Sequence, residues 1–158
     1  MVLNEAGGAI REAKHLYCGH REKAPVFIEY RERKFPGTPI PFVHACWRAK
    51  APPVAGLTHE WAGVKTGGSS ALTGARIGLW IGYSEVLLAG CPMDSSGYFN
   101  TDDTKALPHD VGRLGFGEDL LLYRQRFLDD IEERGHTNIY SMSGWTRKQL
   151  GVPCSFEG

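Results

Sequence analysis

The sequence predicts an α/β fold with a mostly parallel sheet, and three observations support this prediction. From residue 69 onward the patterns alternate as helix, strand, long loop, helix, strand and helix, which places helices on the faces of a parallel sheet. The run Val86–Gly90 is apolar throughout, as is typical of a parallel strand covered on both faces. The helix before it carries a stripe of small residues, which lets a helix lie close to a sheet. These residues are Ala71, Ala75, Gly78 and Gly82.

In the first half of the chain, short apolar runs predict strands, and Pro25 suits the first turn of a helix that reaches about Lys34. The proline-rich segment 36–39 after it predicts a loop, because proline removes a backbone donor and fixes φ. The predicted strands of this half are Val2–Leu3, His15–Cys18, Phe42–Cys46 and Val54–Thr58.

In the second half, a helix is predicted from Ser69 or Ser70, either of which is a good N-cap, to about Tyr83. The segment Cys91–Gly117 is rich in Asp, Ser, Gly, Pro and Thr, and long loops of this kind are usually functional or mobile. The remaining predicted elements are a helix at Glu118–Arg134, a strand at Ile139–Met142 and a short helix at Trp145–Leu150.

Composition narrows the class of protein. The length of 158 residues fits one domain, so we expect a single domain over residues 1–158. Lys plus Arg and Asp plus Glu number 18 each, which argues against a sequence-specific nucleic-acid partner. No apolar run approaches the ~20 residues of a membrane span, and the N-terminus lacks the pattern of a signal peptide. The four cysteines form no Cys-x-x-Cys pair, so we expect buried free thiols and a cytoplasmic protein.

The sharpest local motif is the turn before the helix at residue 69. It reads Gly67-Gly68-Ser69-Ser70, with Lys65 nearby. Glycines allow a close approach of the backbone, and the start of a helix favours an anion such as phosphate. A simple helix cap explains the same residues, so both interpretations stay open at this point.

Polar residues after the apolar strand give further candidates. Asp94 is suited to ribose hydroxyls, to a metal ion or to capping a turn, while Tyr98 and Asn100 offer hydrogen bonds. His109 is either a general base or a solvated loop histidine. His44 and His59 lie at predicted strand ends, but no spacing demands a metal site, and no metal ligand is assigned. Ligands of parallel sheets bind beyond the carboxyl ends of the strands, where three loops are expected to converge.

The segment from about Thr58 to Trp145 resembles two related groups of proteins. They are the MptE-like family, named for 6-hydroxymethylpterin diphosphokinase, and the bacterial sialyltransferases that use a CMP-sugar donor. The resemblance lies in the Gly/Ser turn, the small-residue helix ending in Gly-Tyr-Ser-Glu, and Tyr98-Phe99-Asn100. It implies a Rossmann-like three-layer fold in which Ser69, Ser70 and Tyr98 bind the nucleotide and His109 is the base.

The same resemblance implies a truncation at the N-terminus. These families begin with a strand and a Gly-rich turn, and the chain starts at what resembles their later strand, with Asn4 matching its terminal Asn. Half of the nucleotide site is therefore expected to be absent or supplied by another chain. The first tyrosine of the sialyltransferase site also has no counterpart here.

The resulting functional hypothesis is a transferase of the glycosyltransferase or diphosphokinase type that acts on a nucleotide-activated donor. The alternatives are a non-catalytic, phage-type protein that binds or sequesters a nucleotide, and a structural subunit that forms a homo-oligomer. No cofactor is firmly implied, and a divalent metal bound together with the nucleotide remains an open alternative.

Overall fold

The computed structural model describes residues 1–3, 10–46, 51–62, 64, 69–91, 93–94 and 120–153. The chain divides into two compact units, Met1–Thr66 (unit 1) and Gly67–Gly158 (unit 2), and each is described here by itself. Every pair of neighbouring strands is parallel, in a four-stranded and a two-stranded sheet. The predicted α/β class with a mostly parallel sheet is therefore confirmed, whereas the single domain stays a prediction.

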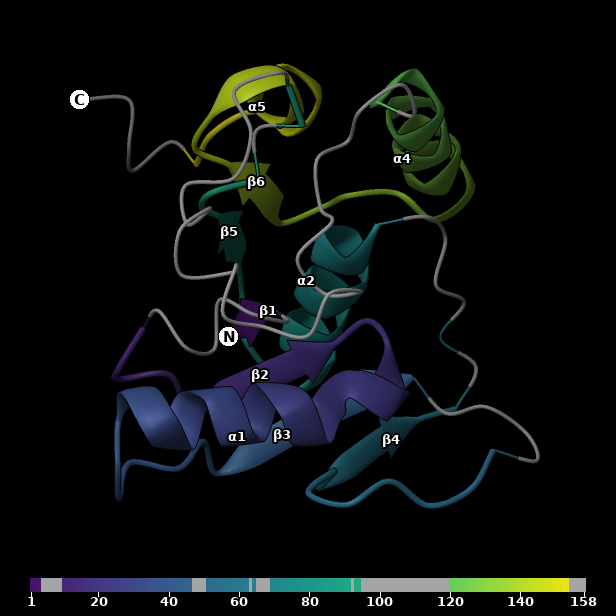
Figure 1. The fold of residues 1–158 in the computed structure, drawn as a ribbon. Coiled ribbons are helices and arrows are strands. Elements are labelled where there is room, and N and C mark those ends of the chain that lie inside the picture. Colours follow the sequence, from purple (N-terminus) through teal and green to yellow (C-terminus); the bar gives the residue numbers. More distant parts are fainter. Residues whose placement is uncertain are drawn as a thin grey trace. The chain divides into compact units, whose positions relative to one another are not determined.

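Unit 1 is a four-stranded parallel sheet with a crossover helix (Figure 1). The strands follow one another in sequence order, and α1 connects β2 to β3. A 3-10 turn at Arg21–Lys23 leads into α1, which has Pro25 in its first turn as expected. Three of the four predicted strands and the predicted helix are confirmed. The elements are β1 Val2–Leu3, β2 His15–Cys18, α1 Ala24–Lys34, β3 Phe42–Cys46 and β4 His59–Trp61.

The guanidinium of Arg31 fixes α1 to the segments around it. Its Nε donates to the carbonyl of Thr38 at 3.0 Å, and its two terminal nitrogens donate to the carbonyls of Ile10 and Arg11 at 2.8 and 2.6 Å. Arg31 is buried, so these bonds satisfy donors that would otherwise be costly to remove from water. One side chain of α1 thus joins the segment before β2 to the α1–β3 connection.

The predicted strand at Val54–Thr58 is wrong, and β4 lies after it. The chain turns at Gly56, whose φ of +81° belongs to no strand, and a Cβ at this position would lie 2.4 Å from Cδ1 of Ile28. Thr58 then starts the pairing with β3, because its amide donates to the carbonyl of Val43 at 2.9 Å.

The described residues of unit 2 form a parallel strand pair and three helices (Figure 1). The register places Val86 opposite Ile139 and Leu88 opposite Ser141. Each predicted element of this unit is present where the structure describes it. The elements are α2 Ser70–Trp80, β5 Val86–Leu88, α4 Leu120–Arg134, β6 Ile139–Ser141 and α5 Gly144–Leu150.

Helix α2 ends at Trp80, three residues before the predicted end at Tyr83. The amide of Tyr83 donates to the carbonyl of Gly78 at 3.2 Å, and the amide of Gly82 donates to that of Leu79 at 3.1 Å. This pair of bonds is the Schellman arrangement that closes a helix with a residue of positive φ, and the φ of Gly82 is +105°.

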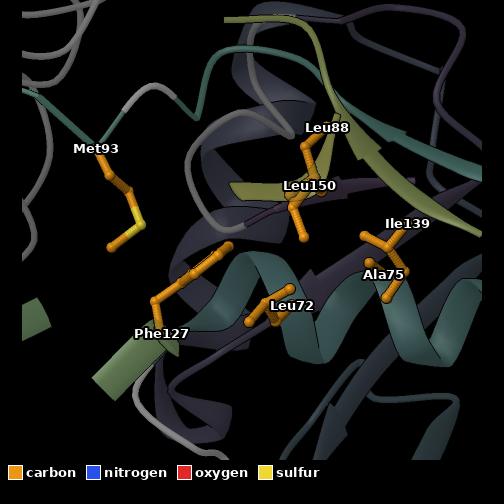
Figure 2. Packing of buried hydrophobic residues seen from close by; sticks show 7 residues of the cluster. All are labelled: Leu72, Ala75, Leu88, Met93, Phe127, Ile139 and Leu150. Atoms are coloured by element: carbon orange, nitrogen blue, oxygen red, sulfur yellow. The ribbon is translucent and has the colours of Figure 1, made fainter. Parts of the chain in front are cut away.

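The core of unit 2 is one cluster to which every helix and both strands contribute (Figure 2). Phe127 of α4 is fully buried in it. Three members of the predicted small-residue stripe pack in this unit: Ala75 belongs to the cluster, Ala71 packs against it, and Gly78 lies against Val86 of β5. The fourth, Gly82, is exposed beyond the end of α2. The buried members are Leu72, Ala75, Leu88, Met93, Phe127, Ile139 and Leu150.

Candidate functional site

The first candidate site lies in unit 2, where α2 begins. Ser69 is the N-cap of α2, and its side chain accepts a hydrogen bond from the amide of Leu72 at 3.4 Å. Its carbonyl accepts both the amide and the hydroxyl of Thr73, at 3.1 and 3.0 Å. Ser70 is the first residue of the helix. The cap uses a lone pair of the Ser69 hydroxyl, and a hydroxyl also has a proton to donate, so capping and anion binding are compatible.

The turn after β5 is held in place by the other helices of the unit. Met93 has a φ of +47°, a backbone conformation that residues other than glycine rarely adopt. Its carbonyl accepts a hydrogen bond from Nε of Arg124 at 2.8 Å. The hydroxyl of Thr146 in α5 donates to the carbonyl of Cys91 at 2.6 Å. Side chains of α4 and α5 thus donate hydrogen bonds to backbone carbonyls of the turn that leads to Asp94. Asp94 itself is half-buried.

The start of α2 and the turn after β5 lie at the same end of the strand pair. Leu72, in the first turn of α2, and Met93 belong to the same cluster, together with Leu88 at the carboxyl end of β5 (Figure 2). Ser69, Ser70 and Asp94 are thus placed by elements that pack together. The other predicted site residues lie outside the described residues; they are Asn4, Gly67, Gly68, Tyr98, Asn100 and His109.

A second group of candidate side chains lies in unit 1. Two of them, His44 and His59, were considered from the sequence, but their grouping was not predicted. Tyr17, His44 and His59 are directly opposite one another on β2, β3 and β4. Alternate residues of a strand share a face, so His15 and Trp61 belong to this face as well. The rings of His15 and His44 stack at 5.2 Å, and those of His44 and His59 at 5.0 Å. We call His15, His44, His59 and Trp61 the imidazole face.

Hydrogen bonds within the imidazole face specify its protonation. The indole Nε1–H of Trp61 donates to Nδ1 of His44 at 3.1 Å, because an indole has no acceptor. Neutral His44 therefore carries its proton on Nε2, which lies 2.9 Å from Nδ1 of His15. His44 donates this bond and His15 accepts it.

The buried position of His44 favours the neutral ring. Only 1% of the residue is exposed. Burial, together with the neighbouring His15 and His59 and the amino group of Met1, lowers the pKa of His44 from 6.5 to about 4. Burial also lowers the pKa of His15, with the amino group of Met1, His59 and Lys14 acting in the same direction.

The sequence contains a signal for this face, in the form of ring-bearing residues at every second position. His15 and Tyr17 show the alternation on β2, Phe42 and His44 on β3, and the pair of residues 59 and 61 on β4. The signal was missed because the fourth strand was predicted at Val54–Thr58, whereas it lies at His59–Trp61.

Metal and thiol chemistry find little support in the described part of the chain. Within residues 1–3, 10–46, 51–62, 64, 69–91, 93–94 and 120–153, no three His, Cys, Asp or Glu side chains gather so that they could hold a metal ion. Cys18 and Cys46 are buried free thiols, as expected, and Cys91 is half-buried. Burial raises the pKa of Cys18 to about 12, which disfavours the nucleophilic thiolate.

Comparisons with known proteins add no relative to this description. In the part of the chain that the structure describes, no helix combines the length and the apolar composition needed to cross a membrane. No family model, curated protein or solved structure matches the chain.

Proposed function

We propose that unit 2 binds the phosphate groups of a nucleotide at the end of the strand pair where α2 begins. The observation that supports this most directly is the packing of Leu72, in the first turn of α2, in one cluster with Met93 of the turn after β5. The first peptide N–H groups of a helix and its dipole favour an anion. Ser69 and Ser70 add two hydroxyl groups at the same helix end.

In this proposal Asp94 binds the ribose. A carboxylate accepts hydrogen bonds from hydroxyl groups and repels phosphate, so its role is with the sugar. Asp94 directly follows Met93, whose carbonyl is bonded to α4. This attachment gives the carboxylate a defined place relative to the first turn of α2.

The proposed reaction is group transfer from a nucleotide-activated donor, of the glycosyltransferase or diphosphokinase type that the sequence resemblance implies. His109 would accept the proton of the attacking hydroxyl as general base. Gly67, Gly68, Tyr98 and Asn100 would complete the nucleotide site. Binding and transfer are separate claims and need separate tests.

Calorimetric titration of the full chain tests the binding claim, with nucleoside mono-, di- and triphosphates and nucleotide sugars as ligands, with and without Mg²⁺. Ser69→Asp keeps a capping side chain but adds a negative charge. It should weaken binding at least ~5-fold, because a like charge ~4 Å away costs roughly 1–4 kcal/mol. Ser84→Asp is the matched control, since Ser84 lies in the connection at the opposite end of α2. The proposal fails if no ligand of the panel binds, or if both variants bind equally well.

Product formation tests the transfer claim. His109→Ala should lower turnover at least ~100-fold while nucleotide binding is unchanged, which is the scale expected when a general base is lost. Tight binding without product on long incubation would instead favour the non-catalytic, sequestering alternative.

A further inference from the structure

The imidazole face of unit 1 has no role in the proposed nucleotide site, yet it joins three strands through side chains. Trp61 on β4 donates to His44 on β3, and His44 donates to His15 on β2. The bonds run in one direction across the sheet. We call these three residues the Trp–His–His chain.

A proton added anywhere to this chain removes one of its bonds. On His44 the added proton would occupy Nδ1. Two N–H groups would then face each other, because the indole nitrogen of Trp61 cannot accept a hydrogen bond. On His15 the added proton would occupy Nδ1, where it would face the Nε2–H of His44. If His44 then carried its own proton on Nδ1 instead, that N–H would face the indole N–H of Trp61. Only the uncharged chain satisfies both bonds.

Within the described residues, the charged groups recorded as acting on His44 all disfavour a proton on it. Along the imidazole face its titratable neighbours are His15 and Tyr17 on β2, Cys46 on β3 and His59 on β4. The amino group of Met1 also disfavours a proton on His44, and Lys14 precedes His15. The hydroxyl of Tyr17 lies 3.2 Å from Sγ of Cys46, so these two groups are paired with each other.

Trp61 belongs to a short edge strand, β4. It is three residues long and lies at the edge of the sheet as described, where it pairs with β3 alone. On the opposite face, Glu60 is bound by the guanidinium of Arg21. Trp61, at the last position of β4, carries the bond to His44.

We propose that the Trp–His–His chain is an acid-sensitive latch, in which neutral His44 holds β4 on the sheet and a proton on His44 releases it. Mildly acidic conditions would then expose the edge of β3 to solvent or to another chain. The latch is independent of the nucleotide site proposed above, so either proposal stands if the other fails.

Amide hydrogen exchange of the full chain from pH 7.5 to 4, corrected for the intrinsic pH dependence of exchange, tests the latch. The amides of β4 should lose at least ~10-fold protection as the pH falls below about 5. His44→Gln retains an acceptor and a donor but does not titrate, and it should keep β4 protected down to pH 4. His20→Gln is the control, because His20 is exposed, pairs with Glu22 and is not part of the Trp–His–His chain. Equal loss in wild type and His44→Gln would overturn the proposal and point to Glu60 and Arg21 instead.

Trp61→Phe provides a second test that does not depend on how well glutamine replaces histidine. This substitution removes the indole N–H that faces Nδ1 of His44 and keeps an aromatic ring. The pKa of His44, followed by NMR of labelled histidine, should rise by at least ~0.5 unit relative to wild type. An unchanged titration of His44, or a wild-type value near 6.5, would contradict the latch.

Discussion

Gly78 of α2 lies so close to Val86 of β5 that a Cβ at position 78 would be 3.0 Å from Cγ2 of the valine. Larger side chains must therefore push the helix and the strand apart. We expect Gly78→Leu to lower the free energy of unfolding by about 1–3 kcal/mol, the usual cost of overpacking. Urea denaturation followed by circular dichroism measures this change.

Gly78→Ala is the informative companion of that variant. Alanine in a helix is favoured over glycine by roughly 1 kcal/mol, which offsets the cost of a contact that Val86 relieves by a small shift. We expect a stability within about 1 kcal/mol of wild type. If Gly78→Leu were as stable as Gly78→Ala, the close packing of α2 on β5 would be refuted.

A second prediction concerns Asp130, whose side chain is 1% exposed and binds two arginines. Nη1 of Arg76 lies 2.5 Å from its carboxylate, and Arg134, one turn along α4, binds the other oxygen. Asp130→Asn removes the buried anion that both guanidinium groups bind, while Arg134 keeps its second partner, Glu133, at 3.1 Å. We expect a loss of about 3 kcal/mol in the free energy of unfolding.

Asp129→Asn is the matched control for Asp130→Asn. Asp129 is exposed and accepts a hydrogen bond from Gln125 at 2.8 Å. The same chemical change should alter stability by less than about 0.5 kcal/mol there. A comparable effect of the two variants would mean that the buried ion pairs contribute nothing.

The parts of the fold that could be predicted are those set by local patterns. Ser69 or Ser70 was predicted as the cap from residue type and position, and Ser69 is the cap. The helix at Glu118–Arg134 was predicted as well, and α4 lies within it. β4 could not be found this way, because Val54 and Leu57 carry the apolar signal while the chain pairs with β3 only from Thr58 onward. Long-range pairing outweighs local propensity in short strands.

The same distinction applies to the candidate sites. The start of α2 is a local feature, and the sequence indicated it directly. The Trp–His–His chain joins residues 15, 44 and 61, and it depends on the register of three strands. A one-residue slip of any strand would turn its rings to the other face, so the chain becomes visible only once the register is known.

A third prediction links the core of unit 2 to its candidate site through Thr146. Its hydroxyl donates to the carbonyl of Cys91 and lies 2.8 Å from the hydroxyl of Ser141. Both Thr146 and Ser141 are fully buried. Thr146→Val keeps the shape but leaves these groups without a partner. We expect a loss of about 1–3 kcal/mol in the free energy of unfolding.

The outcome for Thr146 can be checked against two related variants. Thr146→Ser keeps the hydroxyl and should recover most of the lost stability. Thr137→Val removes a hydroxyl at an exposed turn and should be nearly neutral. If the proposed nucleotide site is correct, Thr146→Val should also weaken nucleotide binding, because it frees the turn that carries Asp94.

The last prediction is the pH dependence of stability that His44 imposes on unit 1. Its pKa is about 4 in the folded protein and 6.5 in the unfolded chain, so between these values the unfolded state binds more protons. This contribution to stability is fully present above pH 6.5 and decreases as the pH falls toward 4. A difference of ~2.5 pKa units corresponds to about 3 kcal/mol at full extent.

Urea titrations at several pH values between 7.5 and 4 measure this slope. His44→Gln should remove most of it, whereas His20→Gln should leave it unchanged, because His20 is exposed. The remaining slope in His44→Gln would report His15, whose pKa is also lowered in the folded state. If wild type and His44→Gln lost stability in parallel over this range, His44 would have to be accessible to protons in the folded protein, contrary to its burial between β2 and β4.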